Sequence, residues 1–108
     1  MSQGGSPEGR VRVELHPWLS EQVSPGHTGV LVLEEPLPAP GRTLRDLLVH
    51  LAVRYEGAAR HIYDAQAGVL REGVLVAHNG RLLPSLRDLD VPLSPGDTVA
   101  LIPAYPGG

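Results

Sequence analysis

Residues 94–108 read SPGDTVALIPAYPGG, and this stretch does most to decide the fold. SPGD (94–97) has the residues of a type II turn, with proline at the second position and glycine at the third. The apolar run DTVALIP (97–103) predicts a strand with Val99 and Leu101 on its core face. The remaining residues include another proline and end in two glycines. We therefore expect 104–108 to form an extended tail that follows the last strand directly.

Further strands and one main helix are expected upstream of this turn. RVRVELH (10–16) alternates as a half-buried strand does, VLVLEE (30–35) predicts a second strand, and VLVAHNG (74–80) predicts a third that ends in an Asn79-Gly80 turn. TLRDLLVHLAVRYEG (43–57) carries leucines at helical spacing behind a Thr43 N-cap, with Gly57 expected as the C-terminal cap. Residues 17–29 are expected to be a connection. A short strand and a helical turn through Leu86 to Leu89 are expected after residue 80.

This order of elements predicts an α+β fold of the β-grasp (ubiquitin-like) type. In that arrangement one main helix packs across a mixed sheet of four or five strands, and the last strand lies centrally beside the first. A chain of 108 residues is long enough for one domain with a core and too short for two. We expect a flexible leader (1–9), a β-grasp domain (10–103) and the tail (104–108).

Composition argues against several classes of function. The net charge of −3 and the lack of a basic stripe argue against nucleic-acid binding. The absence of cysteine excludes disulfides, thiolate zinc sites and a cysteine nucleophile. No apolar run reaches membrane-spanning length and no signal peptide is visible, so we expect a cytoplasmic protein that does not bind membranes. All nine basic residues are arginine, so no lysine amine is available for linking copies of the chain into polymers.

No set of side chains in the sequence is typical of an active site. The five histidines have no metal-ligand spacing to one another or to paired carboxylates, and we expect no metal site. His50 is expected on the solvated surface of the helix, and Glu34 and Glu35 are expected to be solubilising residues at a strand end. We therefore do not expect the chain to be an enzyme by itself.

Residues 74–108 resemble the C-terminal half of the ubiquitin-like sulfur carriers. That family includes the small subunit of molybdopterin synthase, the thiamin sulfur carrier, the carrier for thiocarboxylate-dependent cysteine synthesis and the ubiquitin-related modifier. The resemblance is carried by a strand running into Asn79-Gly80, by PL (92–93) before PGD (95–97), by a final strand and by Gly107-Gly108. LREGVLVAHNG (70–80) is most similar to the cysteine-synthesis carrier and the ubiquitin-related modifier. With the helix included the resemblance covers 10–108, although Pro106 and the long connections at 17–29 and 57–72 depart from it.

The resemblance implies that an activating enzyme of the E1 type adenylates the C-terminal Gly108 with ATP. Sulfur then displaces the adenylate, and the resulting thiocarboxylate serves a sulfur-accepting biosynthetic enzyme. The carrier is implied to be a monomer without a bound cofactor. The residues fit this role, because Gly107 and Gly108 lack a Cβ and can thread a narrow channel, while Pro103 and Pro106 keep the approach extended.

The sequence adds one expectation about the tail and leaves two questions open. Tyr105, Pro106 and Gly107 are expected to be recognised together as the tail. Ala100 and Ile102 alternate away from the core face, so with Tyr105 they form either a docking patch or a face covered by the domain's own loops. The rival functions are a protein modifier that transfers the Gly108 carbonyl to a target lysine, and a non-covalent β-grasp interaction module.

Overall fold

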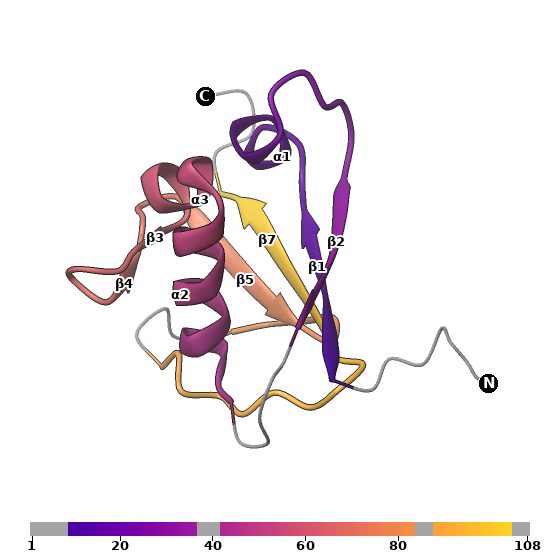
Figure 1. The fold of residues 1–108 in the computed structure, drawn as a ribbon, viewed down its shortest axis with the longest axis vertical. Helices are drawn as coiled ribbons and strands as arrows, with labels where there is room; N and C mark the ends of the chain where they lie inside the picture. The colour runs from indigo at the N-terminus through magenta and orange to yellow at the C-terminus, as the bar shows by residue number, and fades with distance from the viewer. Residues whose placement is uncertain (1–8, 37–41, 84–87, 105–108) are drawn as a thin grey trace.

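A computed structural model describes residues 9–36, 42–83 and 88–104. Its main sheet has five strands in the order β2-β1-β7-β5-β6, and a separate hairpin pairs β3 with β4 (Figure 1). The strands are β1 (Arg10–Leu15), β2 (Leu31–Pro36), β3 (Tyr63–Asp64), β4 (Val69–Leu70), β5 (Val74–His78), β6 (Arg81–Leu82) and β7 (Thr98–Pro103). The helices are α1 (Leu19–Val23), α2 (Leu44–Arg54) and α3 (Glu56–His61).

The last strand lies at the centre of the sheet, as predicted. β7 runs parallel to β1, with Val13 opposite Val99 and Leu15 opposite Leu101, and antiparallel to β5 on its other side. Val99 and Leu101 are fully buried, which confirms the core face expected from their alternation. The parallel pair has a further consequence. β1 and β7 point the same way, so the segment after β1 and the segment after β7 leave the sheet at the same end.

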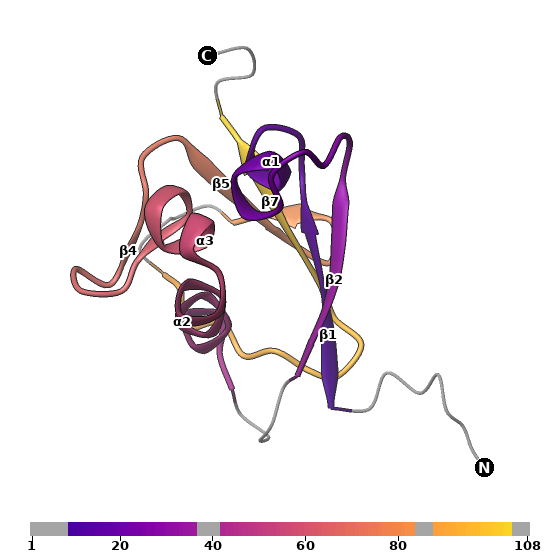
Figure 2. The ribbon, with the colours of Figure 1, turned by 45° about the horizontal axis from the view of Figure 1, so that its top comes forward.

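The predicted main helix is confirmed as α2. The Thr43 side chain accepts a hydrogen bond from the Asp46 amide, and the Asp46 carboxylate accepts one from the Thr43 amide at 3.0 Å. This capping box satisfies backbone donors at the helix start, and the bond from the Thr43 amide lowers the pKa of Asp46. The buried face of the helix consists of Leu44, Leu47, Leu48 and Leu51. In Figure 2 α2 and α3 lie on the same side of the sheet, which is the β-grasp arrangement that was expected.

Two short helices, α1 and α3, occur where the sequence predicted a connection and a helix cap. Residues 17–29, expected to be a connection, contain α1, which buries Leu19 and Ser20. Gly57 does not cap the main helix, because α2 ends in the extended Tyr55 and Gly57 lies inside α3. A Cβ at Gly57 would overlap the carbonyl oxygen of Gln22 in α1. Glycine is therefore needed here for the close approach of two helices rather than for a left-handed cap.

The predicted turns are confirmed, and they connect the strands as expected. Asn79 and Gly80 both have positive φ, at 52° and 87°, and join β5 to β6. Gly96 has a φ of 89°, and the Asp97 amide donates to the Ser94 carbonyl across the turn before β7. The helical turn expected through Leu86 to Leu89 falls mainly outside the described residues, as does the leader apart from residue 9. Among the described residues, no helix is both long and apolar enough to span a bilayer.

Candidate docking face and tail exit

The end of β7 is held from both sides at the point where the chain continues toward the tail. The His16 amide donates to the Leu101 carbonyl at 3.0 Å, and the Ala104 amide donates to the Gly73 carbonyl at 2.6 Å. These bonds connect the exit to the segment after β1 and to the start of β5. The chain therefore leaves from the centre of the sheet at a defined place, and Ala104 is the last residue that the structure describes.

The predicted reactive tail falls outside the described residues. Tyr105, Pro106, Gly107 and Gly108 were expected to be the recognition segment and, in the case of Gly108, the site of adenylation and sulfur attachment. These assignments stay predictions. What the structure supplies is the position of the residue from which the tail begins.

Ala100 and Ile102 lie on the outer face of β7, opposite the face that packs on the helices. Ala100 pairs with Ala77 of β5 on one side and with Glu14 of β1 on the other. It is only 9% exposed, so it adds little accessible surface, whereas Ile102 is half-buried. A docking patch that includes these two residues therefore needs further side chains.

Neighbouring strands supply those side chains. Leu75 pairs with Ile102, and Leu82 of β6 pairs with Ala77, so all of them lie on the outer face. We call this set the outer apolar patch: Leu75, Ala77, Leu82, Ala100 and Ile102. Leu82 is 59% exposed and Leu75 is half-buried, whereas Ala77, like Ala100, is buried at 8% exposure, so Leu75, Leu82 and Ile102 supply the accessible surface. No described helix covers this face of the sheet. The β1 side of the face is charged, with the Arg12 guanidinium 3.2 Å from the Glu14 carboxylate.

Sequence reasoning named two members of the outer apolar patch and missed three. The signal for Leu75 and Ala77 was present, because Val74 and Val76 are the inward positions of the same strand. Leu82 could be assigned once the Asn79-Gly80 turn fixed the pairing of β5 with β6. Strand alternation combined with turn register therefore predicts the patch.

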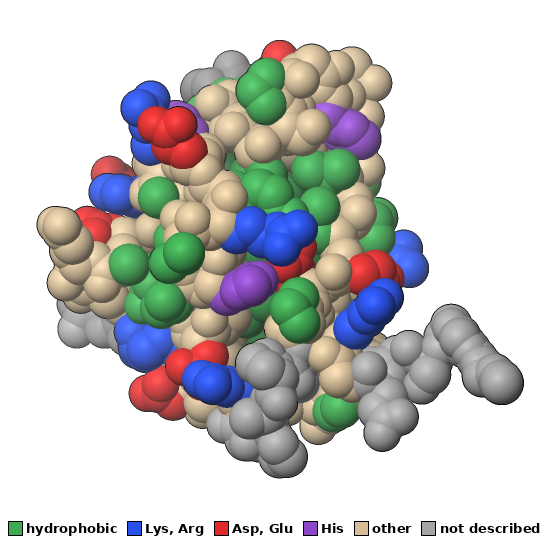
Figure 3. Space-filling model, in the orientation of Figure 1, with side chains coloured by type: hydrophobic (Ala, Val, Ile, Leu, Met, Phe, Trp, Pro, Cys, Tyr) green, Lys and Arg blue, Asp and Glu red, His purple; other side chains and the backbone are tan. Residues whose placement is uncertain are grey.

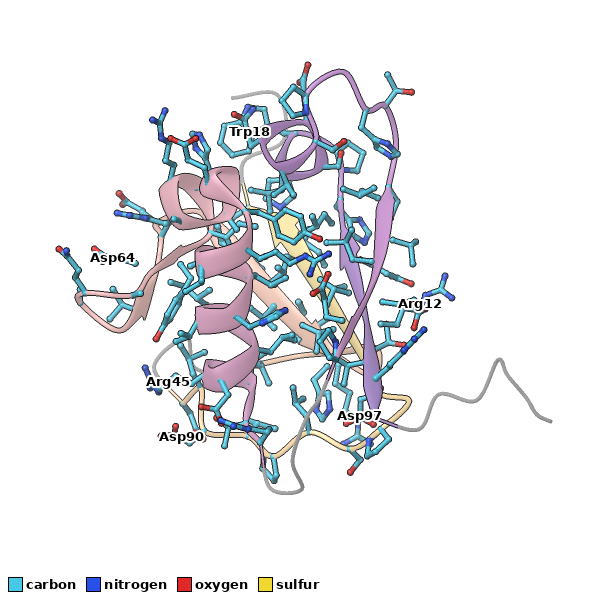
Figure 4. All side chains as sticks on the ribbon, viewed as in Figure 1. Arg12, Trp18, Arg45, Asp64, Asp90 and Asp97 are labelled. Carbon is cyan, nitrogen blue, oxygen red and sulfur yellow. The ribbon has the colours of Figure 1, made fainter. Side chains whose placement is uncertain are left out.

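A polar cluster holds the other end of β7, far from the tail exit. His78 Nε2 lies 2.9 Å from the Asp97 carboxylate, which also accepts hydrogen bonds from the Asn79 side chain and the Ser94 amide. Burial raises the pKa of Asp97, but these hydrogen bonds outweigh it, and the pKa lies below its usual value. Figure 4 places Asp97 and Trp18 at opposite ends of the sheet. The cluster therefore joins two turns and takes no part in the tail exit.

A second polar cluster corrects two predictions. Glu35 is buried rather than solubilising, with its side chain 3% exposed on the inner face of β2. His50, expected on the solvated helix surface, has Nε2 2.9 Å from the Glu35 carboxylate, and the Tyr55 hydroxyl donates to that carboxylate at 3.1 Å. Figure 3 shows basic, acidic and histidine side chains meeting between α2 and β2 among hydrophobic ones. Within the described ranges, no three His, Asp or Glu side chains gather as metal ligands would.

Comparisons with known proteins agree with this architecture. A family model described as the ThiS family matches residues 16–108. No curated protein sequence matches the chain. Among solved structures it is similar to Urm1 from Trypanosoma brucei, with 25% identity, a TM-score of 0.67, and 98% of this chain and 100% of that one covered. It is also similar in fold to SAMP1 from Haloferax volcanii, with 23% identity, a TM-score of 0.66, and coverage of 93% and 100%.

Proposed function

The chain belongs to the ThiS family, and we propose that it is a sulfur-carrier protein that acts through Gly108. An activating enzyme of the E1 type would join the Gly108 carboxylate to AMP from ATP, with release of pyrophosphate. Hydrosulfide would then attack the acyl carbon, the bond from that carbon to the AMP oxygen would break, and AMP would leave. The product is a thiocarboxylate that can donate its sulfur to a biosynthetic acceptor.

The observation that carries the proposal is the family match, because it extends through the last residue of the tail. The residues of the tail support it on chemical grounds. A carboxylate is a poor electrophile and has to be activated inside another protein, so the segment that carries it must be thin. Gly107 and Gly108 have no side chain, and Pro106 restricts the backbone before them, which lowers the cost of ordering on docking.

The outer apolar patch supports a protein partner for this chemistry. The patch lies on β5, β6 and β7, and Ile102 in it is only two residues before the last described residue. Exposed apolar side chains gathered on one face are typical of protein interaction sites. An enzyme that receives the tail can contact Ile102, Leu75 and Leu82 at the same time.

Intact-mass spectrometry tests the proposal. After incubation with ATP, the activating enzyme and sulfide, the mass of the chain should rise by the difference between a sulfur and an oxygen atom, located on Gly108. Gly108→Ala should slow loading by on the order of a hundredfold, because displacing reacting groups by about an ångström has an effect of that size. Asp97→Asn, at the far end of β7, should load nearly as fast as the wild type. An unchanged wild-type mass with every activating enzyme of the source genome would refute the carrier and leave the interaction module.

A protein modifier is the second candidate, and the fold comparison favours keeping it. Similar structures include the small archaeal modifier protein 1 from Methanosarcina acetivorans, at 24% identity and a TM-score of 0.65. The same acyl-adenylate can be attacked by a lysine amine of a target instead of by sulfide. In a cell extract that outcome would appear as isopeptide-linked Gly108 on other proteins. The protein has no lysine, so it is not expected to form lysine-linked polymers of itself.

A further inference from the structure

Trp18 is a large aromatic side chain presented to solvent beside the tail exit. It is 52% exposed and is the only tryptophan in the sequence. Pro17 and Trp18 follow β1, and His16 just before them donates to the Leu101 carbonyl of β7. α1, which begins after Trp18, lies beside the end of β7 in both ribbon views (Figures 1 and 2). Trp18 is therefore at the end of the molecule from which the tail leaves.

The position of Trp18 is held in place by its surroundings. Its φ of 80° and ψ of −55° lie near the γ-turn conformation, which is strained for a residue with a side chain. Such a conformation persists only where neighbouring structure determines it. Here Leu19 and Ser20 are buried immediately after it, and the Ser20 hydroxyl donates to the Gly29 carbonyl at 2.8 Å.

The indole ring of Trp18 has an aromatic neighbour in α3. It packs edge-on against the imidazole of His61 in α3, with the ring centroids 5.4 Å apart. The ring is thus oriented before any partner arrives, although about half of it faces water. Rigid, partly exposed aromatic side chains are the residues that most often dominate binding at protein interfaces, since little conformational entropy is lost when they are covered.

The reach of the tail limits how far from Trp18 an enzyme that reacts with Gly108 can bind. Gly108, the reactive residue of the proposed function, is four residues beyond Ala104, and four extended residues span at most about 14 Å. An enzyme that reacts with Gly108 must therefore bring its active site within that distance of the end of β7. Its surface around the channel then has to lie against the end of the molecule that carries Trp18.

We propose that Trp18 is an anchor for the activating enzyme, inserted into an apolar recess beside the channel that receives the tail. This inference rests on the proposed function. Trp18 would act on binding only, since an indole supplies neither a nucleophile nor a general base for the acyl transfer. It would add an attachment point separate from the outer apolar patch, because it belongs to the segment after β1 and not to the outer face of the sheet.

The test measures ATP–pyrophosphate exchange by the activating enzyme as a function of the concentration of the chain. Trp18→Ala should raise the KM for the chain about tenfold or more, as loss of an interface anchor does, and change kcat by less than about twofold. The KM of Trp18→Phe should lie between the KM of Trp18→Ala and that of the wild type. Val53→Ala, which removes an 82% exposed side chain of α2, is the matched control and should leave both parameters unchanged.

Two further measurements keep the result interpretable. Trp18→Gly suits the positive φ, so it should unfold at or above the wild-type temperature and still show the raised KM. In a chain labelled with 5-fluorotryptophan, the single fluorine resonance should shift when the enzyme is added. If the wild type is adenylated and Trp18→Ala has an unchanged KM, Trp18 is not an anchor, and the proposed carrier function still stands. If the wild type itself is not adenylated, the proposed function fails and the anchor fails with it.

Discussion

Glu35 occupies an inward-facing position of β2, opposite Val11 of β1, where a strand normally carries an apolar side chain. A buried carboxylate is costly unless donors surround it, and here His50 and Tyr55 supply them from α2 and its C-cap. Tyr55→Phe removes only one hydroxyl and leaves the carboxylate with one donor fewer. We expect the free energy of unfolding to fall by about 1–3 kcal/mol, measured by urea denaturation.

Glu34→Gln is the matched control, because Glu34 is the adjacent carboxylate on the solvent side of the same strand. It should change the free energy of unfolding by no more than about 0.5 kcal/mol. Equal effects of Tyr55→Phe and Glu34→Gln would mean that Glu35 is solvated in solution. Sequence alone could not predict the cluster, since alternation assigns Glu35 to the inner face but its partners lie 15 and 20 residues further along the chain.

At the scale of elements, the contact between α1 and α3 depends on a single glycine. Replacing glycine with alanine inside a helix usually stabilises it by about 0.5–1 kcal/mol. At Gly57 the added methyl group would overlap the Gln22 carbonyl, so one helix has to move. Gly57→Ala should therefore lower the unfolding temperature, measured by circular dichroism. Ala59→Gly in the same helix is the control for propensity and should have a smaller effect; a Gly57→Ala variant more stable than wild type would contradict this packing.

The same pair of helices marks the limit of prediction from sequence. α2 and β7 were predictable because their apolar residues repeat over several turns or pleats, and the Asn79-Gly80 and Pro95-Gly96 turns have specific residue requirements. α1 and α3 have five and six residues, which is too few to establish a helical period. Each is stabilised by contacts with the other and with the core, and such contacts join residues that are far apart in sequence.

For the molecule as a whole, stability depends on packing α2 across the sheet. Eighteen buried residues form one cluster that includes the inner faces of β1, β5 and β7 together with the leucines of α2. The domain has a single core of this kind among its described residues, so damage to it should affect every element. Trp18 and the accessible members of the outer apolar patch, Leu75, Leu82 and Ile102, are not members of that cluster, so a partner can cover them without loss of the fold.

Leu51 and Val53 lie on the same helix, α2, and allow a substitution in the core to be compared with one on the surface. Leu51 is 1% exposed and faces the sheet, whereas Val53 is 82% exposed. Leu51→Asp places an unpaired carboxylate in the core and leaves a cavity, a combination expected to cost more than about 4 kcal/mol and to unfold a domain of this size. Val53→Asp introduces the same side chain into the same helix and should melt within a few degrees of wild type. Thermal melts followed by circular dichroism decide the matter, and a cooperative wild-type-like transition for Leu51→Asp would mean that α2 does not pack on the sheet in solution.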